Sequence, residues 1–279
     1  AEMTQEERNA LQRWAEHHKA LAADVPVEDW LSQSDIDKKR KKLEEDPIKW
    51  IKYFFPKYAK YEFAPFHVRA IKRVIEHDEW YEVLSWSREL AKSTVAMFIC
   101  MYLALTKRKR FFVLASATID SAKRLLAPYK INFESNPRIR QFYGSQTTLG
   151  QWTDGEFTAK CGAKFVALGA GSAPRGARNE EVRPDVIYMD DYDTDEDCRN
   201  PETLKKKWDW FEASLYPTRS ISEPTLILWC GNIIAKDCCI KKAGAKARHW
   251  DIVNIRDKDG HSTWPAKNTE EQIDTVLSN

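Results

Sequence analysis

The chain has 279 residues, of which 43% are hydrophobic and 12% aromatic, and this composition excludes a globally disordered protein. The net charge of +2 is close to neutral, so nucleic-acid binding would require a local basic patch. The six cysteines form no C-x-x-C pair and have no histidine at zinc-ligand spacing, which is typical of a reducing compartment. No stretch approaches the roughly 18 apolar residues that span a membrane.

The predicted elements begin with helices and then alternate. Residues 4–43 predict two helices, residues 46–55 a third, and residues 64–77 an amphipathic fourth. Strands are expected at 80–86, 110–118, 164–171, 183–193, 224–232 and 249–257, with helices from 94, at 120–135 and at 201–216. This alternation is typical of a mostly parallel sheet that carries helices on both faces.

Polar residues follow the predicted strands at the points where the strands end. In parallel sheets, ligands bind beyond the carboxyl ends of the strands. The clustering therefore indicates a binding site built from Lys92-Ser93, Ser116–Thr118, Asp190-Asp191 and Gly231-Asn232.

The turn "SWSRELAKST" (85–94) has the lysine and hydroxyl of a phosphate-binding loop, although Trp86 and Ala91 stand where the glycines of G-x-x-x-x-G-K-[ST] are found. A triphosphate needs backbone N–H groups at a helix N-terminus and a compact cation. Lys92 and the Mg²⁺ ligand Ser93 fit these requirements, provided that φ at Ala91 is negative. The alternative interpretation is an ordinary helix start with a solvent-exposed lysine.

The stretch "DVIYMDD" (185–191) predicts a hydrophobic strand that ends on two carboxylates. We expect Asp190 to hold Mg²⁺ and Asp191 to orient or deprotonate the attacking water. A solvated acidic loop is the alternative, and Asp193, Asp195 and the following acidic residues are assigned no catalytic role. The two motifs together predict a P-loop NTPase that binds ATP and Mg²⁺.

Several segments occur in the order found in the large terminase subunit of tailed double-stranded DNA bacteriophages, and the chain resembles this family from about residue 45 to 240. The segments are "YEFAPFHVRAIKRV", "SRELAKST", "FFVLASATIDSAKRLL", "NPRIRQFYG", "GAGSAPRGARNEEVRPDVIYMDD" and "LILWCGN". The resemblance implies a RecA/ASCE-like P-loop NTPase fold with a mostly parallel central sheet flanked by helices.

The resemblance also implies roles for individual residues. Phe66 and His67 would contact the base, and Asn232 would sense the γ-phosphate. Arg88 in cis or Arg175 in trans would stabilise the transition state, with Arg178 as the fallback. The nucleotide-binding loop would comprise Ser87, Arg88, Glu89, Leu90, Ala91, Lys92, Ser93 and Thr94. The sequence departs from the family pattern at Ala91, at His67, where the family often has Gln, and at Asp191, where it usually has Glu.

The expected organisation is a helical extension over residues 1–45, an ATPase domain over 46–240 and a linker or lid subdomain over 241–279, without the nuclease domain of the full-length family. The implied function is ATP-driven translocation of double-stranded DNA into a procapsid. The implied partners are a portal ring, a small terminase subunit and further copies of the chain in a fivefold ring, although the isolated domain could be a monomer. The implied location is the host cytoplasm, outside the mature virion. Two alternatives are a lobe of a helicase-type translocase and a nucleotide-binding DNA-binding module without turnover.

Overall fold

The computed structural model describes residues 3–174 and 182–278. Its centre is a seven-stranded sheet in the order β3-β4-β2-β5-β6-β1-β7, in which every pair is parallel except β3–β4. The strands are β1 (Trp80–Trp86), β2 (Phe111–Ser116), β3 (Glu156–Thr158), β4 (Lys164–Gly169), β5 (Val186–Asp190), β6 (Leu226–Cys230) and β7 (His249–Val253). The predicted fold class, a mostly parallel sheet flanked by helices, is confirmed.

Alternate strand residues face two separate hydrophobic clusters, as the pleat of a strand requires. One face packs against α3 (Pro47–Phe54), α4 (Pro65–Glu76), α5 (Lys92–Leu105), α6 (Ile119–Ser135) and α7 (Pro137–Tyr143). The other face packs against α9 (Pro201–Asp209), the π-helix η1 (Trp210–Leu215) and α10 (Cys239–Lys246). The short α8 (Asp195–Arg199) precedes α9, and the 3₁₀ helix η2 (Tyr216–Thr218) follows η1.

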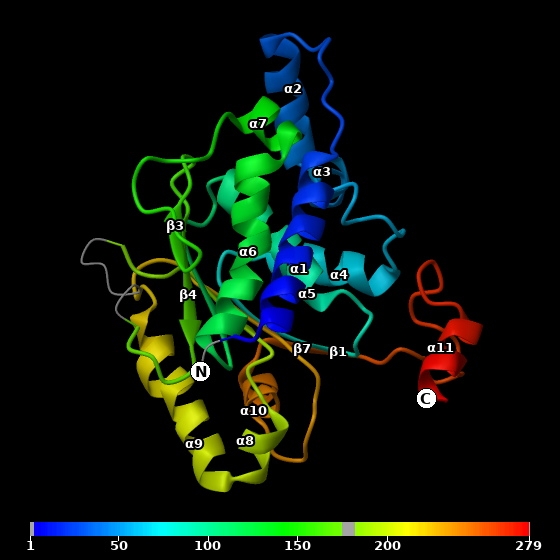
Figure 1. Ribbon diagram of the computed structural model, residues 1–279, viewed down its shortest axis with the longest axis vertical. Coiled ribbons are helices and arrows are strands. Elements are labelled where there is room, and N and C mark those ends of the chain that lie inside the picture. The colour runs from blue at the N-terminus through cyan, green and yellow to red at the C-terminus, as the bar shows by residue number, and fades with distance from the viewer. Residues whose placement is uncertain (1–2, 175–181, 279) are drawn as a thin grey trace.

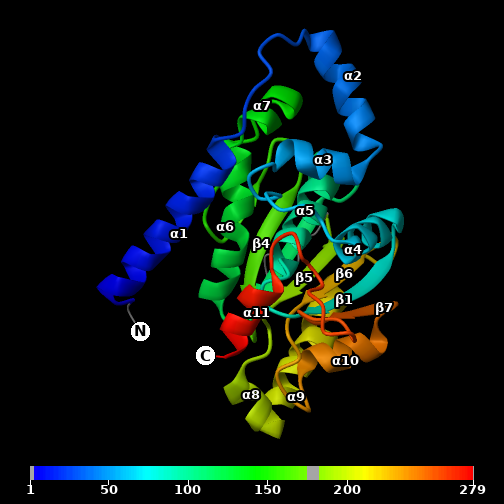
Figure 2. The same cartoon turned by 90° about the vertical axis from the view of Figure 1, so that its right-hand side faces the viewer.

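Two helices precede this core. Helix α1 (Gln5–Ala23) lies along α6, and α2 (Gln33–Glu44) lies against α3 and α7 (Figures 1 and 2). The predicted capping box at the start of α1 is present, because Thr4 and Glu7 each accept a hydrogen bond from the other's backbone N–H. No helix in the described residues is long and apolar enough to cross a membrane.

The central sheet continues beyond residue 240. Strand β7 pairs with β1 from Glu82↔His249 to Trp86↔Val253. Helix α10 lies against β7, and a Cβ at Gly244 would come within 2.3 Å of the Trp250 ring, so only glycine fits there. Because β7 is the strand next to β1, we propose that the ATPase unit extends through Val253 and that the separate C-terminal subdomain begins after it. This subdomain contains α11 (Glu270–Leu277).

Candidate nucleotide-binding site

Strands β5, β6 and β1 are neighbours, and their carboxyl ends open onto a cavity of about 380 Å³. Polar side chains predominate in its lining, in keeping with a charged ligand. The residues that line it are Arg88, Lys92, Asp191, Tyr192, Asp193, Thr194, Asp195, Trp229, Cys230, Gly231, Asn232, Ile234 and Ile240. The structure thus brings together the residues that follow three of the predicted strands.

Helix α5 begins at Lys92 without a side-chain cap. Within residues 3–174 and 182–278, no backbone N–H from Arg88 through Thr94 has a hydrogen-bond acceptor. By contrast, α1, α2, α3, α6 and α9 each begin with a Ser, Thr, Asp or Asn side chain that accepts a backbone N–H. An uncapped helix start next to a cavity combines free N–H donors with the positive end of the helix dipole, so it favours a bound anion.

Ser93 and Asp190 meet at this helix start. The Ser93 Oγ donates a hydrogen bond of 2.8 Å to the Asp190 Oδ2, and the Tyr188 hydroxyl donates to the same oxygen. Asp190 is only 4% exposed, and burial, reinforced by the charge of Asp191, raises its pKa to about 7. A buried carboxylate beside a hydroxyl fits Mg²⁺, which binds through few protein oxygens and completes its shell with water and phosphate.

Among the described residues, no group of three or more His, Cys, Asp or Glu side chains could hold a metal ion.

Asp191 and Arg88 are exposed at the cavity. Asp191 adopts a left-handed conformation with φ of 44°, and its N–H donates to the Cys230 carbonyl. The side-chain oxygen of Asn232 is buried and has no hydrogen-bond partner in the described part of the chain. An unsatisfied buried acceptor at the cavity suits a ligand or water that donates a hydrogen bond. Thr94, at the start of α5, is half-buried.

Phe66 and His67 lie on α4, behind the loop rather than in the cavity lining. Phe66 packs against Trp86, and His67 is fully buried. The His67 Nδ1 accepts from the Ala64 N–H, which fixes the tautomer, so Nε2 donates to the Leu90 carbonyl at 2.9 Å. Burial lowers the pKa of His67 to about 4 and keeps the ring neutral. Both ring nitrogens are therefore engaged within the protein, and the predicted base contact by His67 does not fit this geometry.

Arg175 and Arg178, the candidates for an arginine in trans, lie outside the described residues. Asp193, which was given no catalytic role, accepts the backbone N–H groups of Cys239 and Ile240 and so caps helix α10. Its carboxylate therefore positions the helix that follows Asn232.

The sequence analysis required a negative φ at Ala91, and the structure does not meet this condition. The φ of Ala91 is 62°, and Glu89 in the same loop has a φ of 72°. The left-handed conformation favours glycine, because any Cβ approaches the following carbonyl oxygen. The loop therefore has the backbone shape of a glycine-containing phosphate loop but carries side chains that strain it, a feature that clusters at functional sites.

Replacing Ala91 by glycine should raise the free energy of unfolding by roughly 0.5 to 1 kcal/mol, since relief of left-handed strain exceeds the entropy that glycine adds to the unfolded chain. Urea unfolding measures this change. Ala10→Gly, within helix α1, is the matched control and should lower stability by a similar amount. If Ala91→Gly lowered the free energy of unfolding, the backbone at Ala91 would not be strained.

Three residues at or near the loop were not selected by the sequence analysis. Lys267 and Asn268 donate to the Glu89 carbonyl of the loop, and Trp264 lies against the ring of His67 on α4. No local pattern marks these residues, because their partners lie far away in the sequence. Only the position of "WPAKN" after the last strand, close to the carboxyl end of β1, could have suggested them.

The chain forms an α/β domain whose strand order is that of P-loop NTPases, with β6 between β1, which leads into the loop before α5, and β5, which ends on the carboxylates. Among solved structures, the fold is similar to that of the HK97 bacteriophage large terminase, with 13% identity and a TM-score of 0.49, covering 88% of this chain and 44% of that chain. It is also similar to the large terminase ATPase domain of Thermus phage P74-26, with 13% identity and a TM-score of 0.47, covering 81% of this chain and 90% of that chain.

A third similar structure is S. cerevisiae Dbp5 bound to Nup159, Gle1, IP6 and ADP, with 8% identity and a TM-score of 0.46, covering 78% of this chain and 52% of that chain. The present chain thus spans less than half of the HK97 terminase. At these identities the likeness concerns the fold alone. No protein-family model and no curated protein matches the sequence.

Proposed function

We propose that this chain is the ATPase domain of a viral DNA-packaging motor and hydrolyses ATP with Mg²⁺. The observation that carries the hydrolase part is the run of backbone N–H groups from Arg88 through Thr94 that have no acceptor among the described residues. This run spans the uncapped start of α5 and includes Lys92, so donors and a cation are present together, as a phosphate site requires.

Each residue at the cavity has a chemical task in this proposal. The Lys92 ammonium contacts the β- and γ-phosphate oxygens, while the free N–H groups hold the remaining oxygens. Ser93 and Asp190 would hold Mg²⁺, which, when bound, neutralises charge on the phosphate oxygens. Asp191 orients the attacking water and accepts its proton.

Two further residues act at the γ-phosphate in this proposal. Arg88 is exposed at the cavity and can reach charge that develops on the γ-phosphate oxygens in cis. Asn232 lines the same cavity, where its side-chain N–H₂ can donate to a γ-phosphate oxygen that hydrolysis removes.

The motor part of the proposal rests on the order of the sequence motifs that resemble the large terminase family. Its partners would be double-stranded DNA, a portal ring, a small terminase subunit and further copies of the chain in a ring. An arginine in trans from the segment that holds Arg175 would make hydrolysis depend on that ring.

Equilibrium binding of a fluorescent nonhydrolysable ATP analogue, followed by phosphate release with and without Mg²⁺, tests the hydrolase part. We expect saturable binding that ATP competes away, and release that requires Mg²⁺ and increases with duplex DNA. Absence of saturable binding would refute the site. Binding without release, also at concentrations that favour ring assembly, would favour the nucleotide-binding module without turnover.

A further inference from the structure

Two residues of the C-terminal subdomain donate hydrogen bonds to the phosphate-binding loop. The Lys267 Nζ donates to the Glu89 carbonyl at 2.8 Å and to the Glu89 carboxylate at 2.9 Å. The Asn268 side chain donates to the same carbonyl at 3.4 Å. Because the Glu89 carboxylate is largely exposed, the ion pair alone contributes little, and the charged hydrogen bond to the backbone is the stronger restraint.

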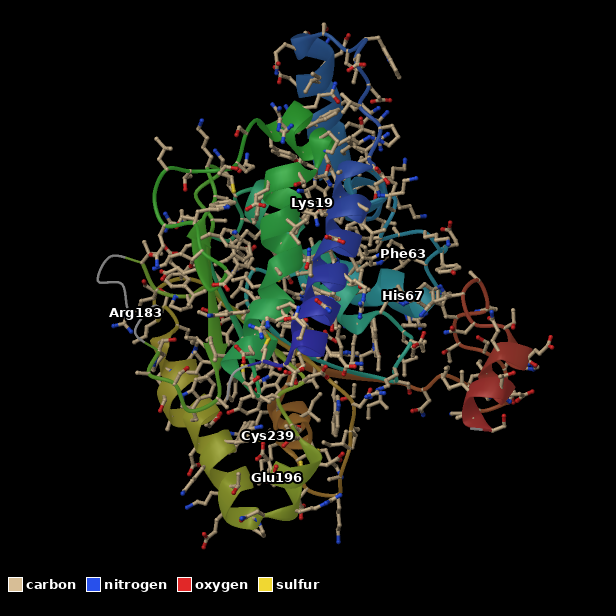
Figure 3. All side chains as sticks on the ribbon, viewed as in Figure 1. Lys19, Phe63, His67, Arg183, Glu196 and Cys239 are labelled. Atoms are coloured by element: carbon tan, nitrogen blue, oxygen red, sulfur yellow. The ribbon has the colours of Figure 1, made fainter. Side chains whose placement is uncertain are left out.

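A second restraint comes from α4. His67 donates to the Leu90 carbonyl, one residue further along the loop. Trp264 joins the two restraints, because its ring lies 4.4 Å from the His67 ring and its Nε1 donates to the Glu62 carbonyl at 2.7 Å. Trp264 is only 6% exposed, so the subdomain is packed against α4 rather than resting on the surface. Figures 2 and 3 show the subdomain on the side of the molecule where α4 carries His67.

The two restraints fix the direction of the loop's N–H groups. In a planar trans peptide, the N–H of a residue points opposite to the carbonyl of the preceding residue. Since the Glu89 carbonyl is turned toward Lys267, the Leu90 N–H points away from Lys267. The Leu90 carbonyl is turned toward His67, so the Ala91 N–H points away from His67. These two N–H groups belong to the run without an acceptor among the described residues.

The loop needs such restraints because of its own residues. Glu89 and Ala91 both occupy the left-handed region, which a loop with glycines enters without strain. A strained conformation persists only where its surroundings hold it. Here the carbonyls between the two strained residues are the ones that His67, Lys267 and Asn268 hold.

We propose that Lys267, Asn268 and His67 are positioning residues that form a loop clamp, which holds the strained phosphate-binding loop with its N–H groups ready for phosphate. The inference rests on the proposed nucleotide site and adds the residues that pre-organise it. Coupling between two sites is reciprocal, so bound nucleotide should in turn hold the C-terminal subdomain in place.

Lys267→Met tests the clamp, because methionine keeps much of the apolar stem but removes the charged donor. We expect the dissociation constant of a nonhydrolysable ATP analogue to rise about tenfold, with the melting temperature almost unchanged, since one charged hydrogen bond that orders the loop is lost. Lys267→Arg should restore most of the affinity. Lys258→Met is the matched control, because it removes the same charge from an exposed position in the same subdomain.

Hydrogen exchange of residues 262–269 provides a second measurement. In the wild type, bound analogue should slow exchange there, and in Lys267→Met this protection should disappear. A purely structural role for Lys267 would instead lower the melting temperature and leave the affinity unchanged. Equal affinity and equal protection in Lys267→Met and the wild type would overturn the clamp while leaving the nucleotide site intact. Failure of the wild type to bind the analogue would overturn both.

Discussion

Lys92→Ala should reduce Mg²⁺-dependent ATP hydrolysis by at least about a hundredfold, because the loss removes the compact cation that stabilises charge on the transferred phosphoryl group. The Lys92 ammonium lies at the cavity, and among the described residues it has no hydrogen-bond or ion-pair partner. Its removal therefore costs little folding energy. Phosphate release and thermal unfolding measure the two effects separately.

Lys72→Ala is the control for this variant, since Lys72 is exposed on α4 and its loss changes the net charge equally. It should keep both hydrolysis and stability. If Lys92→Ala hydrolysed ATP at the wild-type rate, this lysine would not contact the phosphates during the reaction. A large fall in melting temperature would show that its ammonium supports the fold.

Asp190→Asn should also reduce hydrolysis at least about a hundredfold, since the variant lacks the negative charge that holds Mg²⁺. Asparagine can still accept hydrogen bonds from Ser93 and Tyr188, whereas alanine would leave both hydroxyls unpaired at a cost of about 1–3 kcal/mol each. The asparagine variant thus separates the loss of charge from the loss of packing.

The raised pKa of Asp190 sets the direction of the stability change. Between the ordinary carboxyl pKa of 3.8 and about 7, the folded protein binds this proton more tightly than the unfolded chain does. The stability that the neutral carboxyl supports is therefore present at low pH and lost as pH rises through about 7. In the absence of metal, Asp190→Asn and the wild type should have the same melting temperature near pH 4. As the pH rises to 8, the melting temperature of the variant should become higher than that of the wild type.

Asp185→Asn provides the contrast. Its two carboxylate oxygens accept the N–H groups of Arg110 and Phe111, and an amide has only one acceptor oxygen. This variant should lose stability but keep hydrolysis. If Asp190→Asn destabilised the protein at pH 8 as Asp185→Asn does, Asp190 would be a structural carboxylate.

The sequence allowed much of this site to be predicted, because strand ends are visible in it. The hydrophobic runs before Lys92 and Asp190 indicated that both residues follow parallel strands, and such ends lie at one edge of a sheet. The Ser93–Asp190 hydrogen bond agrees with that expectation. The edge strand β3 was not predicted, because three residues give no detectable alternation.

Other features depend on tertiary contacts or backbone angles that residue patterns do not encode. Whether Ala91 has a positive φ cannot be read from its identity. His67 was assigned to the base from its place in a motif, yet its orientation depends on the Ala64 N–H and the Leu90 carbonyl. Lys267 reaches the loop only because β7 runs parallel to β1 and ends at the same edge of the sheet.

The position of β1 in the sheet has a consequence for how the protein acquires its shape. Both of its neighbours, β6 and β7, are made much later by the ribosome, since Trp80 pairs with Leu226 and Glu82 with His249. Until those segments emerge, the nascent β1 has neither edge occupied. Pairings between such distant parts of a chain form slowly, and unpaired apolar strands are prone to aggregate. Strand β1 can therefore take its place in the sheet only after residues 226–253 have been synthesised.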